Sequence, residues 1–136
     1  MRNTLSAFLL AVISASSSAQ TRWKEAGKTS AGNIVSIDAK SLKTKDGITT
    51  ASVQVKFVPP VKASKGEWYL SRHVAMFNCA KKTFAAKSST YYGDYAATKV
   101  VEKNVNAIPG FGPAIGGSMT QVALDYVCAN AKKQRG

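Results

Sequence analysis

The chain has 136 residues, the length of a single domain, with 19 lysines and arginines against 7 acidic residues. Its formal net charge of +12 argues against basic partners and favours anionic ones, such as lipopolysaccharide, sulfated glycans, acidic proteins or nucleic acid, with an affinity that falls as salt rises. Two cysteines and one histidine match no metal-ligand spacing, so neither a metal site nor a cofactor is expected.

Residues 1–19 have the features of a secretory signal peptide. Arg2 supplies the positive charge, and the run from Leu5 to Ile13 is apolar but too short to cross a bilayer. Small residues precede the expected cleavage site between Ala19 and Gln20. A buried N-terminal helix is the alternative. No cysteine lies near this site, so we expect an exported protein without a lipid anchor, either periplasmic or secreted to the cell surface.

The two cysteines are Cys79 and Cys128. In an exported chain they favour one disulfide, which would close a loop of about fifty residues. Two free, buried thiols are the alternative.

The first half of the chain predicts short strands. They span residues 22–27, 33–38, 42–45 and 48–58, with a turn of Asp, Lys and Ser residues at 38–41. In the last strand, Ala51, Val53 and Val55 alternate with polar residues, which indicates one buried and one solvated face. Asp46-Gly47 is typical of a two-residue hairpin turn. Pro59-Pro60 should end the strand, because proline cannot donate to the ladder.

The stretch from Leu70 to Phe84 predicts the central strand of the sheet and contains Cys79. Both of its faces are partly apolar, so we expect a loop or a second subunit, in a homodimer, to cover the second face. Residues 83–92 either continue this strand or begin a new one. Residues 98–105 form a further strand.

Residues 108–117 are rich in glycine and proline and precede a helix predicted from Ser118 to Ala131. Ser118 and Gln121 have the spacing of a capping box. The loop lacks the lysine of a phosphate-binding P-loop, so we interpret it as a flexible connector.

Strands followed by one helix indicate an α+β fold, an antiparallel sheet with the helix packed on one face. A disulfide from Cys128 would turn Leu124 and Val127 toward the sheet. Residues 20–131 would then form the domain and residues 132–136 a basic tail. No segment after the signal peptide is long and apolar enough to span a membrane.

The sequence gives little support for catalysis. His73 is the only histidine, and no nucleophile is tied to it, so we interpret it as structural and expect no enzymatic activity. Aromatic residues and lysines between Lys81 and Tyr95 would allow base stacking. The export signal argues against specific nucleic-acid binding as the main role.

Three motifs carry a resemblance to a known family. They are Ile37-Asp38-Ala39-Lys40-Ser41-Leu42, Asn78-Cys79-Ala80 and Val127-Cys128-Ala129-Asn130. In this order and spacing, from Trp23 to Asn130, the chain resembles the surface-adhesin protein E family of Gram-negative bacteria.

The resemblance implies a six-stranded antiparallel sheet with the helix packed on it, and a disulfide between Cys79 and Cys128. It also implies adhesion to host matrix and serum proteins such as vitronectin, laminin and plasminogen. The family's vitronectin-binding stretch is a basic segment around the first cysteine. The matching residues here are Lys65, Arg72, Lys81, Lys82 and Lys87.

One departure affects the function that the resemblance implies. The family's adhesins are typically lipoproteins, whereas this chain lacks the lipid-accepting cysteine. A periplasmic structural or stress-related envelope protein with no host ligand is therefore the alternative, because fold transfers better than function.

Overall fold

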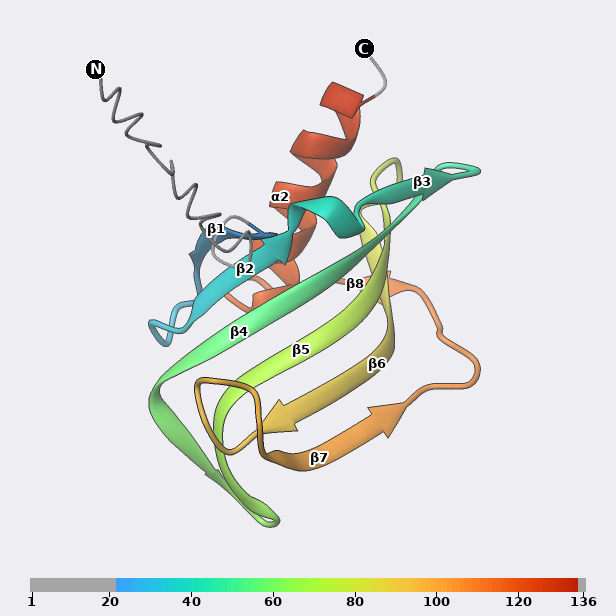
Figure 1. Ribbon diagram of the computed structural model, residues 1–136. Coiled ribbons are helices and arrows are strands. Elements are labelled where there is room, and N and C mark those ends of the chain that lie inside the picture. The colour runs from blue at the N-terminus through green and yellow to red at the C-terminus, as the bar shows by residue number, and fades with distance from the viewer. Residues whose placement is uncertain (1–21, 135–136) are drawn as a thin grey trace, which may run out of the picture.

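The computed structural model describes residues 22–134, so the predicted signal peptide lies outside the described residues. One antiparallel sheet and one long helix make up the fold (Figure 1). The elements in chain order are β1 (Trp23–Lys28), β2 (Ile34–Asp38), the short 3-10 helix η1 (Ala39–Ser41), β3 (Lys43–Lys45), β4 (Ile48–Ala63), β5 (Gly66–Asn78), β6 (Thr83–Tyr92), β7 (Val100–Val105), β8 (Gly112–Pro113) and α2 (Met119–Gln134). The predicted α+β fold is confirmed. No helix in this part of the chain is long and apolar enough to cross a membrane.

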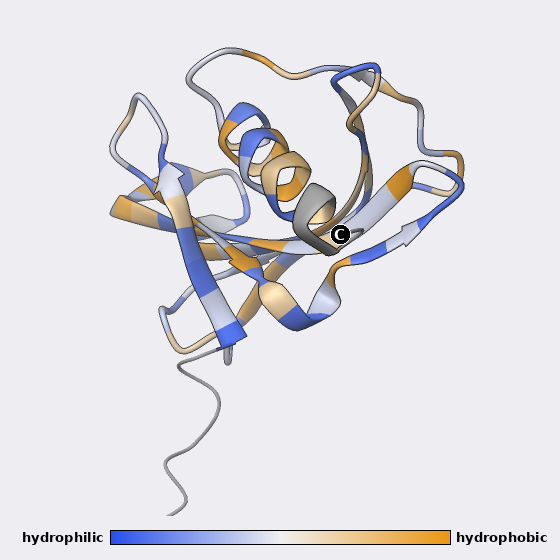
Figure 2. Ribbon diagram, turned by 90° about the horizontal axis from the view of Figure 1, so that it is seen from above, coloured by the Kyte–Doolittle hydropathy of each residue, from blue (hydrophilic) through white to orange (hydrophobic). Residues whose placement is uncertain are grey.

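The strands run through the sheet almost in chain order. The order is β1-β2-β4-β5-β6-β7, with β3 paired to β4 and β8 paired to β6. Figure 2 shows the sheet curling around α2, so that the helix lies within the curve. The sheet therefore has a helix face, which is covered, and an outer face.

Alternation along the strands builds the core on the helix face. In β4, buried Ala51, Val53 and Val55 alternate with more exposed polar residues, as the sequence predicted. Phe77 of β5 and Val127 of α2 are each at most 1% exposed and belong to the same core cluster. Burying side chains of this size supplies most of the driving force for folding.

The predicted disulfide is confirmed. Cys79 lies directly after β5 and bonds to Cys128 on α2, with their Cα atoms 5.4 Å apart. Leu124 and Val127 face the core, as expected from the position of Cys128 on the helix. The disulfide thus ties the helix to the centre of the sheet.

The prediction that Pro59-Pro60 ends a strand is wrong, because β4 continues to Ala63. The pairing of β4 with β5 shifts between Lys56 and Val61, so both prolines fall in the irregularity. The last residue of β4 that pairs with β2 is also Lys56. Neither proline therefore needs to donate a ladder hydrogen bond.

The predicted central strand from Leu70 to Phe84 is two strands, β5 and β6, joined by a turn. In this turn Lys82 has a φ of 52°, in the left-handed region, and the amide of Lys81 donates to the side-chain oxygen of Asn78 (3.1 Å). The turn places Cys79 at the end of β5.

The predicted capping box does not form. The hydroxyl of Ser118 donates to the carbonyl of Ile115 (2.5 Å), and the side-chain amide of Gln121 donates to Asp125 (2.8 Å). Each side chain therefore has a partner other than the backbone amide that a capping box requires. The helix also continues three residues beyond the predicted end at Ala131.

Candidate functional site

The basic residues matched to the family's binding segment do not lie together. Lys65 is at the tip of the β4–β5 hairpin, whereas Lys81 and Lys82 are in the turn at the other end of β5. The 13 residues of β5 separate them, which is roughly 40 Å of extended chain. Lys87 lies on β6, and Arg72 lies in the middle of β5. Of the five, Lys87 lines a hollow of about 290 Å³ between β6 and the end of β7, and Arg72 lines a larger groove.

This groove lies on the outer face of the sheet and has a volume of about 860 Å³. Thr50, Ser52 and Arg72 point into it because they alternate along β4 and β5 with residues that face the helix. The complete lining, which we call the basic groove, is Arg22, Trp23, Asp38, Lys40, Ser41, Lys43, Thr50, Ser52 and Arg72.

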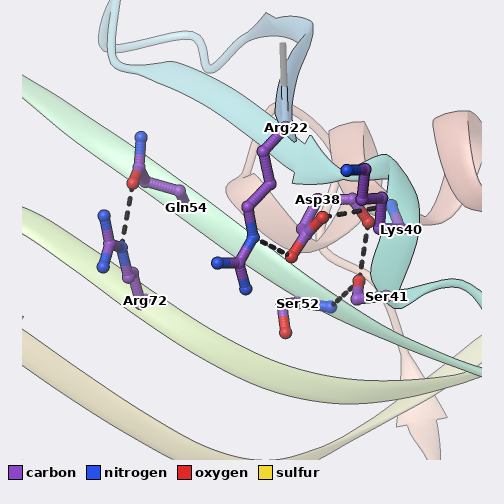
Figure 3. A network of polar contacts seen from close by, with 7 residues as sticks. All are labelled: Arg22, Asp38, Lys40, Ser41, Ser52, Gln54 and Arg72. Atoms are coloured by element: carbon purple, nitrogen blue, oxygen red, sulfur yellow. Dashed lines mark hydrogen bonds and ion pairs between the residues drawn. The ribbon is translucent and has the colours of Figure 1, made fainter. Parts of the chain in front are cut away.

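Arg72 is held in place by neighbouring strands. Its Nε donates to the side-chain oxygen of Gln54 on β4 at 3.0 Å (Figure 3). Its guanidinium carbon lies 5.2 Å from the ring centre of Trp23 and 5.7 Å from that of Tyr92, within cation–π range. Among the described residues its two terminal nitrogens have no hydrogen-bond partner. These two nitrogens are held in fixed positions and can donate two parallel hydrogen bonds to a carboxylate, sulfate or phosphate.

Asp38 organises the other side of the groove. Its Oδ2 accepts from Arg22 Nε (2.5 Å), and its Oδ1 accepts from the backbone amide of Lys40 (3.0 Å), where it caps η1. The hydroxyl of Ser41 donates to the Asp38 carbonyl (2.7 Å) and accepts from the amide of Ser52 (2.8 Å), which joins η1 to β4 (Figure 3). Asp38 is 2% exposed, so its role is to hold Arg22 and η1 in place at this side of the groove.

The charge of the groove is positive. Arg22, Lys40, Lys43 and Arg72 are its four cationic side chains, and the single carboxylate, Asp38, is already paired with Arg22. Lys40 and Lys43 are exposed and form no ion pair with any side chain between residues 22 and 131. The groove can therefore hold an anionic group without first displacing an internal partner.

Replacing Asp38 with alanine is expected to lower the free energy of unfolding by about 1–2 kcal/mol, because η1 loses its cap and the Lys40 amide loses its acceptor. Urea denaturation measures this loss. Asp38→Asn is the control, since its side-chain oxygen can still accept from the Lys40 amide while the charge that pairs with Arg22 is removed. Its effect should stay below about 1 kcal/mol because the Arg22 side chain is 57% exposed. Equal losses in the two variants would contradict the capping role.

His73 lies on the opposite, helix face of the sheet. It is 7% exposed, and its Nε2 and Nδ1 each lie 2.8 Å from a serine hydroxyl, of Ser71 and Ser89 respectively. Burial lowers its pKa from 6.5 to about 4, so the ring is neutral at physiological pH. Between residues 22 and 134, no group of three or more His, Cys, Asp or Glu side chains could hold a metal ion.

The sequence pattern did not reveal Arg22, Lys40 and Lys43 as neighbours of Arg72. Arg22 directly precedes β1, Lys40 lies in η1 and Lys43 begins β3. For Lys40 the sequence did contain a local signal, because Asp38 and Ser41 are residues typical of the turn in which Lys40 lies. The pairing of β4 with β5, which brings Arg72 to this corner, had no local signal.

Comparisons with known proteins agree with this architecture. The family model described as surface-adhesin protein E matches residues 23–129. Three solved structures of Haemophilus influenzae protein E share the fold at 13% sequence identity each. The structure of protein E has a TM-score of 0.56 and covers 83% of this chain and 88% of that chain. The selenomethionine form has a TM-score of 0.54 (81% and 88% covered), and crystal form II has 0.51 (71% and 80% covered).

No curated protein matches the chain. The family match spans most of the sequence and includes both cysteines, the curled sheet and the helix as far as Ala129. It also includes every residue of the basic groove except Arg22. The chain belongs to the surface-adhesin protein E family.

Proposed function

We propose that the protein is an exported, non-enzymatic adhesin that holds an anionic partner in the basic groove around Arg72. Membership of an adhesin family supports a binding role. The observation that carries the proposal is the guanidinium of Arg72, fixed between Trp23 and Tyr92. Within the described part of the chain its terminal nitrogens are free, and Lys40 and Lys43 beside it have no ion-pair partner.

The partner class follows from this geometry. A fixed guanidinium binds a planar or tetrahedral oxyanion through two parallel hydrogen bonds, and nearby lysines add charge without strict geometry. Acidic stretches of host matrix or serum proteins, with vitronectin, laminin and plasminogen as the first candidates, offer such groups. Sulfated glycans and the phosphates of lipopolysaccharide offer them too. Binding to any of them should weaken as salt increases.

The variant Arg72→Gln/Lys40→Gln/Lys43→Gln is expected to weaken binding roughly tenfold or more, because it removes charge-assisted hydrogen bonds that each contribute about 1.5–3 kcal/mol. Surface plasmon resonance on immobilised vitronectin, laminin, plasminogen and a sulfated glycan, at low and high salt, measures the change.

The matched control is Lys65→Gln/Lys81→Gln/Lys82→Gln, which also removes three positive charges, but from residues outside the groove. If both variants weaken binding equally, general charge attraction explains the affinity and the groove is not the site. If the control variant weakens binding more, the binding residues are those at the two ends of β5.

The location of the protein tests whether it reaches a host partner at all. We expect added protease to digest the mature chain on intact producing cells, or the chain to be recovered from the medium. Protection in the periplasm would contradict direct host binding and would support the role of a structural envelope protein. Light scattering of the purified protein tests the predicted homodimer.

A further inference from the structure

The helix face of the sheet contains a cavity that the basic groove does not use. It has a volume of about 360 Å³ and lies between strands β4, β5 and β6, two loop segments, 29–33 and 117–118, and the first residue of α2, Met119. Ligand sites commonly measure about 300–1,000 Å³, so this cavity is the size of a small site.

Aromatic side chains form one wall of the cavity. The rings of Trp68 and Tyr91 stack, with centroids 4.0 Å apart and planes 26° apart, and Phe57 lies 6.1 Å from Trp68. The ring of His73 meets Tyr91 edge to face at 5.7 Å. Phe57, Trp68 and Tyr91 remain only half-buried, because part of their ring surface faces the cavity. Flat apolar surface of this kind favours an aromatic ligand.

The cavity is uncharged in a strongly basic protein. As far as the structure describes the chain, its lining includes no lysine, arginine, aspartate or glutamate. His73 is neutral at physiological pH, and both of its ring nitrogens already contact serine hydroxyls. A charged ligand would lose its hydration here without gaining an oppositely charged partner, so the lining favours uncharged molecules.

The mouth of the cavity is held in shape by the loops that border it. The backbone amide of Ser30 donates to the carbonyl of Gly117 at 2.9 Å, and the hydroxyl of Ser30 donates to the same oxygen at 3.2 Å. The amide of Asn33 donates to the hydroxyl of Thr29, which closes the first loop (3.1 Å). A site with fixed walls loses little conformational entropy when a ligand enters.

We propose that this cavity binds a small, uncharged aromatic molecule of one or two rings, packed against Phe57, Trp68 and Tyr91. This site is independent of the basic groove, which lies on the other face of the sheet and takes anions.

The neutral two-ring fluorescent probe 6-propionyl-2-(dimethylamino)naphthalene tests the site on the full mature chain. We expect saturable binding of one probe per chain. The affinity should not change at high salt, because neither the probe nor the cavity lining carries charge. In a Trp23→Phe background Trp68 is the remaining tryptophan, and the bound probe should quench its emission.

Ala31→Trp and Ala129→Trp form the matched pair of variants. Both alanines are exposed, but Ala31 lines the cavity and Ala129 lies on α2 away from it. Ala31→Trp should weaken probe binding at least about tenfold by filling the mouth, whereas Ala129→Trp should leave binding unchanged. Non-saturable binding, loss of binding at high salt, or the same affinity in both variants would overturn the proposal. Equal thermal unfolding temperatures confirm that both variants fold.

Discussion

Replacing Cys79 and Cys128 together with alanine is expected to lower the free energy of unfolding by about 4 kcal/mol. The disulfide joins residues separated by 49 positions, and the chain-entropy relation gives this value for a loop of about that length. The loss approaches the whole stability of a small domain, typically about 5–15 kcal/mol. Urea denaturation of the oxidised protein and the variant measures the difference.

The urea dependence separates this cause from damage to the core. Without the cross-link the unfolded chain expands, so the slope of the unfolding free energy against urea should increase. A conservative core change such as Val127→Ala leaves the cross-link intact and should leave that slope unchanged. Reduced wild-type protein should behave like the double variant. A loss below about 1 kcal/mol, with an unchanged slope, would contradict the proposed role of the disulfide.

Acidification from pH 7 to pH 4 is expected to remove about 3 kcal/mol of stability through His73 alone. Burial lowers the pKa of its ring from 6.5 in the unfolded chain to about 4 in the folded protein. Well above pH 6.5 the ring is neutral in both states and contributes no pH dependence. Between pH 6.5 and about 4 the unfolded state binds a proton that the folded state does not, so stability falls as pH falls.

His73→Gln provides the comparison. It is expected to lower the free energy of unfolding by about 1–3 kcal/mol at pH 7, because the hydroxyls of Ser71 and Ser89 lose their ring partner. Its stability should then fall less steeply with acid than that of the wild type. Comparing the two proteins cancels the contribution of the carboxylates, which both share. Parallel pH curves for the two proteins between pH 7 and 4 would contradict the assignment to His73.

Local patterns were sufficient to predict most of the elements. Asp46 and Gly47 both have a positive φ and join β3 to β4, as their residue types indicated. The alternation in β4 identified the core face, because one side of the strand packs under the helix and the other faces the groove. In each case the physical cause acts within a few residues, so the sequence contains it.

The register between β4 and β5 could not be predicted in this way. The prolines of β4 shift the pairing, so the partner of Arg72 depends on an irregularity several residues away from it. Gln54, which pairs with Arg72, and the lysines of the groove therefore become neighbours through the folded sheet alone. Lys65 and Arg72, only seven positions apart, belong to different parts of the surface because the extended strand β5 separates the hairpin tip from the middle of the strand.

The sequence predicted the structural role of His73 but not both of its side-chain contacts. A structural role was expected from its position on a strand, and the two serine contacts agree with that role. Ser71 lies two positions away on the same face, which the strand period explains. Ser89 comes from β6, and its contact requires the β5–β6 pairing that a single strand cannot reveal.

The position of α2 after all the strands has a consequence for how the chain reaches its folded state when its N-terminal part emerges first, during synthesis or export. Strands that neighbour each other in the sheet follow each other along the chain, so the sheet can assemble as it emerges. The helix, however, packs against β1, β2 and β4, among the earliest parts. Until α2 arrives, Val35, Ile37 and Val53 have no cover, and the nascent sheet presents an apolar surface that a holding chaperone would recognise.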